Sequence, residues 1–461
     1  MVRRRFALLG LAVVSALVAG TLAGPGAPLA EADNGDSELP LVDGGQFLFW
    51  PADLGEVQAA NVFGTVKIAW LFSTTAVNWT SFVPALGVVD YLVIPGSVLW
   101  IVSDGAQMLV IETAVEPDPE PDSGLGDDLR VMELGTLPPG GGSFDLTVEE
   151  GESSFLVYAK APMITHLVAI VNVIGPGGES VVAPNSLVSN IGESALLIPQ
   201  IPAIVIVPGV YTVFVESRVG TTVGAIVKTA ADGFQVIDAT FWVATSSGEL
   251  KTEEDREALA AIYRTRGDQI FNSQGLGIGE ITFADPPQAV IDEYASIAVP
   301  AFAPPTELSE VCLEMSEAFG DDRSVHLVLV DEITDVGGES NGTLGIASGI
   351  PGATILGGMW TSCVLVTANL DGFGAADNAG TVWHEVGHLL GLFHTSESSG
   401  DSFDFFNDTP ECAFAKDANA DGFVDKFECP DGSNFIFYNS EGTEISVGQA
   451  ALMGNHPLFH S

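Results

Sequence analysis

The chain has 461 residues, of which 47% are hydrophobic and 16% are charged. This length accommodates two or three domains, and the hydrophobic share excludes a largely disordered chain. The 61 acidic residues far outnumber the 15 Lys and Arg, which gives a formal net charge of -46 at pH 7. That charge repels nucleic-acid phosphates and anionic lipid headgroups, so both are excluded as partners. We attribute the acidity to solubility, together with some calcium binding.

The first 32 residues have the pattern of a signal peptide. Arg3, Arg4 and Arg5 precede an apolar stretch at 6–22, and Ala-Glu-Ala at 30–32 supplies a small-x-small cleavage site. Gly, Pro and Asp residues interrupt the later apolar stretches, so none of them is a candidate for a spanning helix. We therefore expect a secreted, extracellular protein with no membrane span.

Two β-rich regions are expected after the signal peptide. Residues 33–128 contain short β-branched and aromatic runs separated by Gly, Pro and Asp, and their last part, 116–128, has the Pro- and acid-rich composition of an extended linker. This region is a propeptide, an adhesion module, or part of one larger sandwich with 129–232. Strand and turn spacing in 129–232 predicts a β-sandwich and resembles the small modules (pre-peptidase C-terminal type) of secreted bacterial peptidases. His166 lies in an apolar strand there, and we expect a structural role for it.

Residues 233–461 show an alternation of strands and helices that predicts an α/β (α+β) domain. Thr252 with Asp255 indicates the start of a helix that runs to about residue 272. A second helix is expected at 305–319, and a glycine-broken strand at 342–349 is suited to the edge of a mixed, twisted sheet. The whole chain is thus predicted to be multidomain, with an all-β N-terminal part and an α/β C-terminal part.

Four cysteines lie in the last third of the chain, namely Cys312, Cys363, Cys412 and Cys429. An even number of cysteines in an exported chain predicts disulfides. Their spacing favours the pairs 312–363 and 412–429, although the sequence permits three pairings.

The stretch W-H-E-V-G-H-L-L-G-L-F-H at 383–394 contains three of the seven histidines of the chain. On a helix that begins near residue 379, His384 and His388 are one turn apart on the same face, so their imidazoles can share one metal. Glu385 lies beside them, where it can bond a water on that metal. Gly391 can adopt positive φ and end the helix in a turn that brings His394 back to the metal. Three neutral imidazoles leave a fourth position open for water, which is typical of a catalytic zinc site.

This motif resembles the long zinc signature of the metzincin metallopeptidases, and the likeness extends over residues 233–461. D-T-P-E-C at 408–412 and N-F-I-F-Y at 434–438 resemble the pappalysin-like secreted bacterial members. The resemblance implies a metzincin-like fold with an active-site helix, and hydrolysis of peptide bonds in protein or peptide substrates. It also implies that zinc and Glu385 activate the attacking water.

Metzincins also place a methionine in a tight turn beneath the zinc, and this sequence departs from that pattern. Met453 lies at the end of a segment that itself looks like the last helix of the family. The better alignment puts the turn at 434–438, with Ile436 at the methionine position. Tyr438 then falls where related enzymes carry a tyrosine near the metal, and it either bonds the oxyanion of the reaction or is a packed aromatic.

A second cation is predicted at D-A-N-A-D-G-F-V-D-K-F-E, residues 417–428, which matches the twelve-residue calcium loop by position. Gly422 provides the sharp turn of that loop. The expected oxygen ligands come from Asp417, Asn419, Asp421, Phe423, Asp425 and Glu428. The acids at 401, 404 and 408 are candidates for another calcium site.

These observations predict a secreted zinc-dependent endopeptidase stabilised by calcium. A substrate could add to the strand at 342–349 as a further antiparallel strand. The alternative is a secreted adhesion or binding protein whose protease-like domain is catalytically inactive. The sequence indicates no cleavage preference and no oligomeric state.

Overall fold

The computed structural model describes the strands between residues 37 and 111, and then residues 125–184, 190–231, 233–246, 250, 252–299, 306–334, 342–368, 375–439 and 442–461. The expected signal peptide lies outside the described residues. The chain divides into two compact units, Met1–Pro121 and Asp122–Ser461. None of the helices within the described ranges is long and apolar enough to cross a membrane.

The N-terminal unit consists of antiparallel β-structure, as its sequence predicted. Its strands form a four-stranded sheet of order β2-β7-β4-β5 and two strand pairs, β1-β8 and β3-β6. The strands are β1 (Ser37–Leu41), β2 (Gly44–Phe49), β3 (Val57–Gln58), β4 (Ile68–Ser73), β5 (Asn78–Phe82), β6 (Leu92–Val93), β7 (Val98–Ser103) and β8 (Gln107–Ile111).

The expected β-sandwich is confirmed at the start of the second unit. Two four-stranded antiparallel sheets, β10-β15-β12-β13 and β14-β11-β16-β9, enclose a core in which Phe155 and Tyr211 meet edge to face at 5.2 Å. The strands are β9 (Leu129–Leu137), β10 (Gly142–Val148), β11 (Glu152–Lys160), β12 (Leu167–Ile174), β13 (Asn190–Ile191), β14 (Glu193–Ile198), β15 (Gly209–Ser217) and β16 (Thr221–Thr229). Alternate residues of β15 are buried, because successive side chains of a strand point to opposite faces.

The C-terminal part has a five-stranded mixed sheet of order β18-β17-β20-β23-β22. All neighbours are parallel except β22 and β23, which pair antiparallel. The expected edge strand at 342–349 is therefore present, in the shorter form of β22. The strands of this sheet are β17 (Gln235–Ala244), β18 (Leu276–Ala284), β20 (Ser324–Val330), β22 (Gly345–Ala347) and β23 (Cys363–Thr367). Two further strands, β19 (Ser296–Ala298) and β21 (Glu332–Thr334), form a separate parallel pair. The helices are α3 (Glu253–Phe271), α4 (Gln288–Tyr294), α5 (Thr306–Phe319), α6 (Ala375–Leu389) and α7 (Val447–Asn455), with short 3-10 turns at Asn272–Gln274 and Phe414–Lys416.

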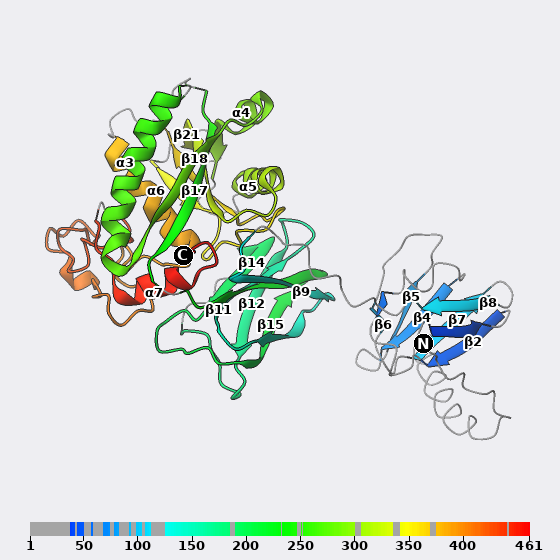
Figure 1. Cartoon of the computed structure of the whole chain (residues 1–461). Coiled ribbons are helices and arrows are strands. Elements are labelled where there is room, and N and C mark those ends of the chain that lie inside the picture. Colours follow the sequence, from blue (N-terminus) through cyan, green and yellow to red (C-terminus); the bar gives the residue numbers. More distant parts are fainter. Residues whose placement is uncertain are drawn as a thin grey trace, which may run out of the picture. The chain divides into compact units, whose positions relative to one another are not determined.

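Helices cover both faces of this sheet (Figure 1). Helices α3 and α6 pack on one face around Phe241 and Trp383, whereas α4 and α5 pack on the other around Trp242 and Met315. The predicted start of α3 is confirmed, because the Thr252 hydroxyl accepts the Asp255 N–H at 3.2 Å. Sequence analysis missed α4, β19 and β21, because elements of three to seven residues are too short to show a period.

Both expected disulfides are present. Cys312 on α5 is bonded to Cys363 on β23, and Cys412 is bonded to Cys429. Of the three pairings that the sequence permits, the structure therefore has the one that the spacing favours. The expectation that His166 lies in a strand was wrong, because it lies at a bend directly before β12 and is half-buried. His326 on β20 is buried, and the Phe319 ring stacks on it at 4.7 Å.

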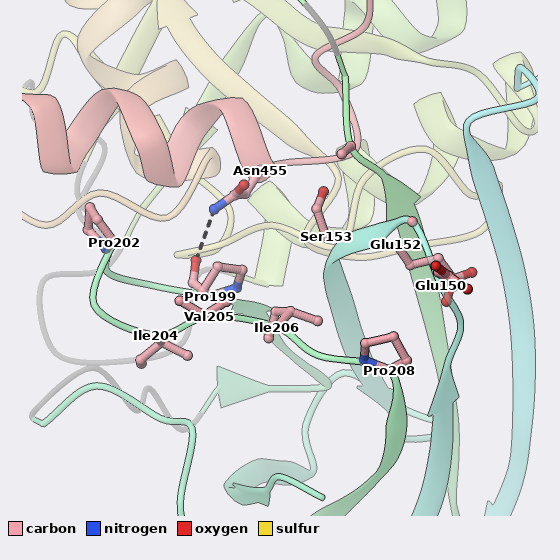
Figure 2. A pocket seen from close by; sticks show the side chains of 12 residues that line it. Glu150, Glu152, Ser153, Pro199, Pro202, Ile204, Val205, Ile206, Pro208 and Asn455 are labelled. Atoms are coloured by element: carbon pink, nitrogen blue, oxygen red, sulfur yellow. Dashed lines mark hydrogen bonds between the residues drawn. The ribbon is translucent and has the colours of Figure 1, made fainter.

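The sandwich and the α/β part share a core. Leu156, Leu197 and Ile226 of the β14-β11-β16-β9 sheet belong to the same buried cluster as Trp383 and Phe459 of the α/β part. An open pocket of about 570 Å³ is lined by sandwich residues and by Asn455 at the end of α7. Figure 2 shows these lining residues, among which Asn455 donates to the Pro199 carbonyl at 3.4 Å. Because the two parts bury apolar surface against each other, they fold as one compact unit.

Phe271 connects four segments of the α/β part, because its ring meets those of Trp383, Phe435 and Phe459 edge to face at 5.6, 6.0 and 6.3 Å. Phe271→Ala should lower the free energy of unfolding by about 3–5 kcal/mol, since it leaves a cavity between these rings. The measurement is urea denaturation. Phe214→Ala is the control, because Phe214 is 37% exposed and its loss should cost less than about 0.5 kcal/mol. Equal losses for the two variants would contradict this account of the core.

Candidate metal centre

Helix α6 carries the first part of the histidine motif and is held by buried contacts on its apolar side. Val382, Trp383 and Val386 are fully buried, and the Trp383 indole N–H donates to the Tyr263 carbonyl at 2.8 Å. The helix begins at Ala375, so the expectation of a start near residue 379 was wrong. Asn378 is the fourth residue of the helix. It lies inside the helix and bonds Tyr263 Oη at 2.6 Å and the Thr367 carbonyl at 2.8 Å.

Gly391 ends α6 as the sequence predicted. Its φ is 104°, its N–H donates to the His388 carbonyl at 2.8 Å, and the Leu392 N–H donates to the Gly387 carbonyl at 3.0 Å. This pair of bonds is the Schellman arrangement, in which a residue with positive φ reverses the chain after the last helical turn. His394 is thereby returned to the face of α6 that carries His384 and His388.

The three imidazoles converge through their Nε2 atoms. Nε2 of His394 lies 3.1 Å from Nε2 of His384 and 3.1 Å from Nε2 of His388. One ligand atom from each ring falls within 4.8 Å of the others. Three ring nitrogens that face one another at this spacing can be bridged by one ion, and nitrogen donors suit zinc better than calcium or magnesium.

Every ring is also anchored through its other nitrogen. Nδ1 of His384 lies 2.9 Å from the Phe435 carbonyl, and Nδ1 of His388 lies 2.7 Å from the Leu392 carbonyl. Nδ1 of His394 lies 2.9 Å from Oε1 of Glu397. These acceptors place the proton on Nδ1 and leave the Nε2 lone pairs for a metal. The donor set therefore fits zinc.

Burial shifts the pKa values of two histidines and of Glu385 in the site. It lowers the pKa of His384 to about 4, with a smaller contribution from His394, and lowers the pKa of His388 well below its ordinary value. Both rings are therefore neutral near pH 7, as metal ligation requires. Burial also raises the pKa of Glu385 to about 8, which the Ala347 N–H opposes by bonding the carboxylate.

The segment 434–438 lies directly under the zinc-motif helix. Its Ile436 is fully buried, and a Cβ added to Gly387 of α6 would lie 2.9 Å from Ile436 Cδ1. Met453 is also buried but belongs to α7, in agreement with the alignment that assigns that segment to a helix. Tyr438 donates its hydroxyl to the Val424 carbonyl at 2.7 Å.

The loop at 417–428 is closed by its own side chains. Glu428 Oε1 accepts the N–H groups of Ala418 and Asn419 at 2.8 and 3.0 Å, and Asp417 Oδ2 accepts the Gly422 N–H at 3.0 Å. Gly422 has a φ of 94°, as the sharp turn requires. Further side-chain acceptors in the loop include Asn419 Oδ1 for the Asp421 N–H, Asp421 Oδ1 for the Phe423 N–H and Asp425 Oδ1 for the Phe427 N–H.

Asp417 Oδ1 is buried and has no hydrogen-bond partner. A carboxylate oxygen in that position is costly unless a donor or a cation meets it. Nearby, Cys412, Cys429 and Asp431 approach one another, but the two sulfurs form a disulfide and are not metal ligands.

The carboxylates at 401, 404 and 408 accept hydrogen bonds from neighbouring groups. Asp408 bonds the start of α7, with Oδ2 accepting the Gly448 N–H at 2.8 Å and Oδ1 accepting from Ser446 Oγ at 2.9 Å. Asp404 Oδ1 accepts from Thr409 Oγ1 at 2.6 Å, and burial raises the pKa of Asp404 to about 7. Asp401 accepts from the Ser399 hydroxyl.

Sequence analysis missed three groups around the histidine motif at 383–394. They are the Glu397 carboxylate, the Phe435 carbonyl and the Ala347 N–H. Glu397 could have been found, because it is an acid three residues after the last histidine of the motif. The two backbone groups could not, because their positions depend on how distant segments pack.

Comparison with known proteins provides no family. No protein-family model matches the chain, and no curated protein sequence does. One solved structure with similarity is the Glycosylation Associate Protein (Gap123) complex from Streptococcus agalactiae, at 8% identity and a TM-score of 0.14, covering 47% of this chain and 69% of that chain. Another is the T13 IBDV viral particle, at 13% identity and a TM-score of 0.15, covering 42% and 55%. The infectious bursal disease virus Gx strain gives 11% identity and a TM-score of 0.13, covering 45% and 55%. These TM-scores are too low to indicate a shared fold.

Gly391→Ala tests the turn that returns His394. A side chain at a φ of 104° should cost about 1–3 kcal/mol of folding free energy, and the displaced ring should weaken zinc binding. Denaturation and equilibrium zinc titration measure the two effects. Gly380→Ala on the same helix is the control, because Gly380 has ordinary helical φ and only the Arg266 side chain within 4 Å, so alanine should stabilise the helix or leave it unchanged. Unchanged zinc affinity in Gly391→Ala would contradict the role of the turn.

Proposed function

We propose that this protein is a secreted zinc-dependent endopeptidase of the metzincin type. The observation that carries the proposal is the convergence of the three Nε2 atoms of His384, His388 and His394, with every Nδ1 held by a backbone carbonyl or carboxylate. A structural zinc site would have four protein ligands, whereas three leave room for a water and a substrate. The carboxyl of Glu385, which is half-buried and next to His384 on the same helix, supplies the proton-transfer group that hydrolysis needs.

Zinc, when bound, supplies a Lewis acid that acidifies a water and polarises the scissile carbonyl. Glu385 takes the proton of the attacking water and then delivers it to the leaving amine. Its pKa of about 8 without metal, raised by burial, lies near the pH at which a general base and acid can act in turn. The Ala347 N–H holds this carboxylate beside the edge strand.

The edge strand β22 is the proposed docking site for substrate. It pairs with β23 on one side and is the last strand of its sheet among the described residues, so an extended peptide can pair with its other side. Gly345 of this strand lies against Glu385, since an added Cβ would be 2.6 Å from Glu385 Cγ. Main-chain pairing would therefore deliver a peptide bond next to the proposed base.

A calcium ion is proposed in the loop at 417–428. Its support is the buried, unpartnered Oδ1 of Asp417, together with the backbone bonds of Glu428 and Gly422 that shape the loop. The loop and its disulfide lie in sequence between His394 and the turn that contains Ile436. Calcium there would stabilise the segment that supports the metal site.

Glu385→Ala tests the proposed base. The variant should keep zinc, because the three ligands are unchanged, while cleavage of an unfolded protein substrate should fall at least about 100-fold, the usual contribution of a general base. Bound zinc is measured by metal analysis and cleavage by peptide release. The control Glu257→Ala changes an exposed acid on α3 and should cleave at the wild-type rate. A wild-type protein that binds one zinc and cleaves nothing in a broad peptide library would favour the inactive binding protein.

Calcium titration tests the second site. At 100 times its dissociation constant, a ligand that binds only the folded state stabilises it by about 2.7 kcal/mol. The zinc-loaded wild type should therefore melt at a higher temperature with calcium, and Asp417→Asn should lose most of that shift. Glu411→Gln, at an exposed acid outside the loop, should keep it. A melting temperature that is independent of calcium in the wild type would refute the site.

A further inference from the structure

A buried carboxylate joins the sandwich to the α/β part. Glu193, the first residue of β14, is fully buried and accepts the N–H groups of Trp360 and Thr361 at 3.0 and 3.2 Å. The Thr361 hydroxyl donates to the same carboxylate. Lys160 is its direct cross-strand partner on β11, and the Lys160 ammonium donates to the Gly358 carbonyl and lies 5.0 Å from the centre of the Trp360 ring. A buried charge with this many partners fixes the loop that supplies them.

That loop, which we call the buttress loop (residues 350–362), contacts the end of the histidine-bearing helix α6 directly. The Thr361 hydroxyl oxygen accepts the Ala353 N–H at 2.9 Å. The next residue back, Gly352, donates its N–H to the carbonyl of Leu389 at 2.9 Å. Leu389 is the last residue of α6 and directly follows His388. The contact is close, because a Cβ on Gly352 would lie 2.3 Å from the Leu389 side chain and 2.3 Å from the Thr361 carbonyl.

The Leu389 carbonyl is the atom through which the buttress loop bonds the end of α6. The Schellman bonds use the carbonyls of Gly387 and His388, whereas Leu389 is bonded by the buttress loop. Pro351 of the loop also lies 3.7 Å from the position of a Cβ on Gly391. The loop therefore contacts α6 between the second histidine and the turn that sets the third.

We propose that Glu193 is a positioning residue for the metal site, through which the β-sandwich holds the end of the zinc-motif helix in its ligating geometry. The inference rests on the proposed zinc site. On this account the sandwich contributes to the geometry of the proposed catalytic site. Its carboxylate orders the buttress loop, and the loop fixes the relative placement of His388 and His394. Groups bonded directly to the ligands commonly change metal affinity 10- to 100-fold when altered, and we expect Glu193, which acts through the buttress loop, to lie at the low end of that range.

A second acid on the sandwich provides a matched control. Asp128 bonds Arg323 at 2.7 Å between Oδ2 and Nη2, and Arg323 also donates to the carbonyls of Pro457 and Phe459 at 2.8 and 2.9 Å. This ion pair also joins the sandwich to the α/β part, but it ends at the C-terminal segment. Asp128→Asn and Glu193→Gln are the same acid-to-amide change at the two contacts.

The experiment compares the full-length wild type with these two variants. Zinc affinity is measured by competition with a chromophoric chelator, and ligand geometry by the visible spectrum of the cobalt(II)-substituted protein. Glu193→Gln should bind zinc about tenfold or more weakly with an altered cobalt spectrum, whereas Asp128→Asn should match the wild type in both. Wild-type affinity and spectrum in Glu193→Gln would overturn the proposal, and so would equal changes in the two variants.

Metal-free hydrogen exchange separates this inference from the proposed function. In Glu193→Gln, faster exchange should extend from Trp360 and Thr361 to Gly352 and Leu392. Faster exchange confined to the first two amides would overturn the coupling, even if the protein is a zinc enzyme. A wild type that binds no zinc would instead refute the proposed function. If Glu193→Gln does not fold, Thr361→Val removes the hydroxyl link to Ala353 and keeps the carboxylate, and the same outcomes apply.

Discussion

The reversal of the chain at Gly391 is the constraint on which the convergence of the three histidines depends. A helix alone can bring two histidines to one face, but a third histidine six residues later would point away from them. The positive φ of Gly391 and the two Schellman bonds turn the chain back within three residues, so that the His394 ring meets the other two at 3.1 Å. The turn is stable only because its surroundings are packed. Leu452 of α7 and Pro351 of the buttress loop both lie within 4 Å of where a side chain on Gly391 would begin.

Two of the groups that support the site are close in sequence to the histidines, and two come from distant segments of the chain. Phe435, under the helix, anchors His384, Leu392 anchors His388 and Glu397 anchors His394. The edge strand contributes the Ala347 N–H to Glu385. Moving any of these segments would change the direction of one ring or of the carboxylate. The shared core, which holds the segments in place, therefore maintains the geometry of the site.

Three of the 15 Lys and Arg residues of this acidic chain bond groups inside the fold. Arg323 and Lys228 bond carbonyls of the C-terminal segment, and Lys160 bonds the buttress loop. Burial lowers the pKa of Lys228 to about 7, yet three acceptors surround its ammonium. The junction between the sandwich and the α/β part is therefore built from buried charges with specific partners as well as from apolar contacts.

Much of this organisation is local, and local features can be derived from the sequence. The spacing of His384, His388 and His394, the glycine between them, the start of α3 and the favoured cysteine pairs follow from helical periodicity, from the φ range of glycine and from short loop closure. The calcium-loop match at 417–428 is of the same kind, and its ion remains a proposal.

Tertiary structure alone decided the rest. Helix α6 begins at Ala375, before the start near residue 379 that the sequence predicts. Within this first turn Asn378 is buried and bonds Tyr263 and Thr367. The anchors of His384 and Glu385 are backbone groups, which every residue possesses, so no residue type could mark them. The union of the sandwich with the α/β part depends on Glu193 meeting a loop more than 150 residues away. Such contacts are set by packing between distant segments, which periodicity and spacing along the chain do not encode.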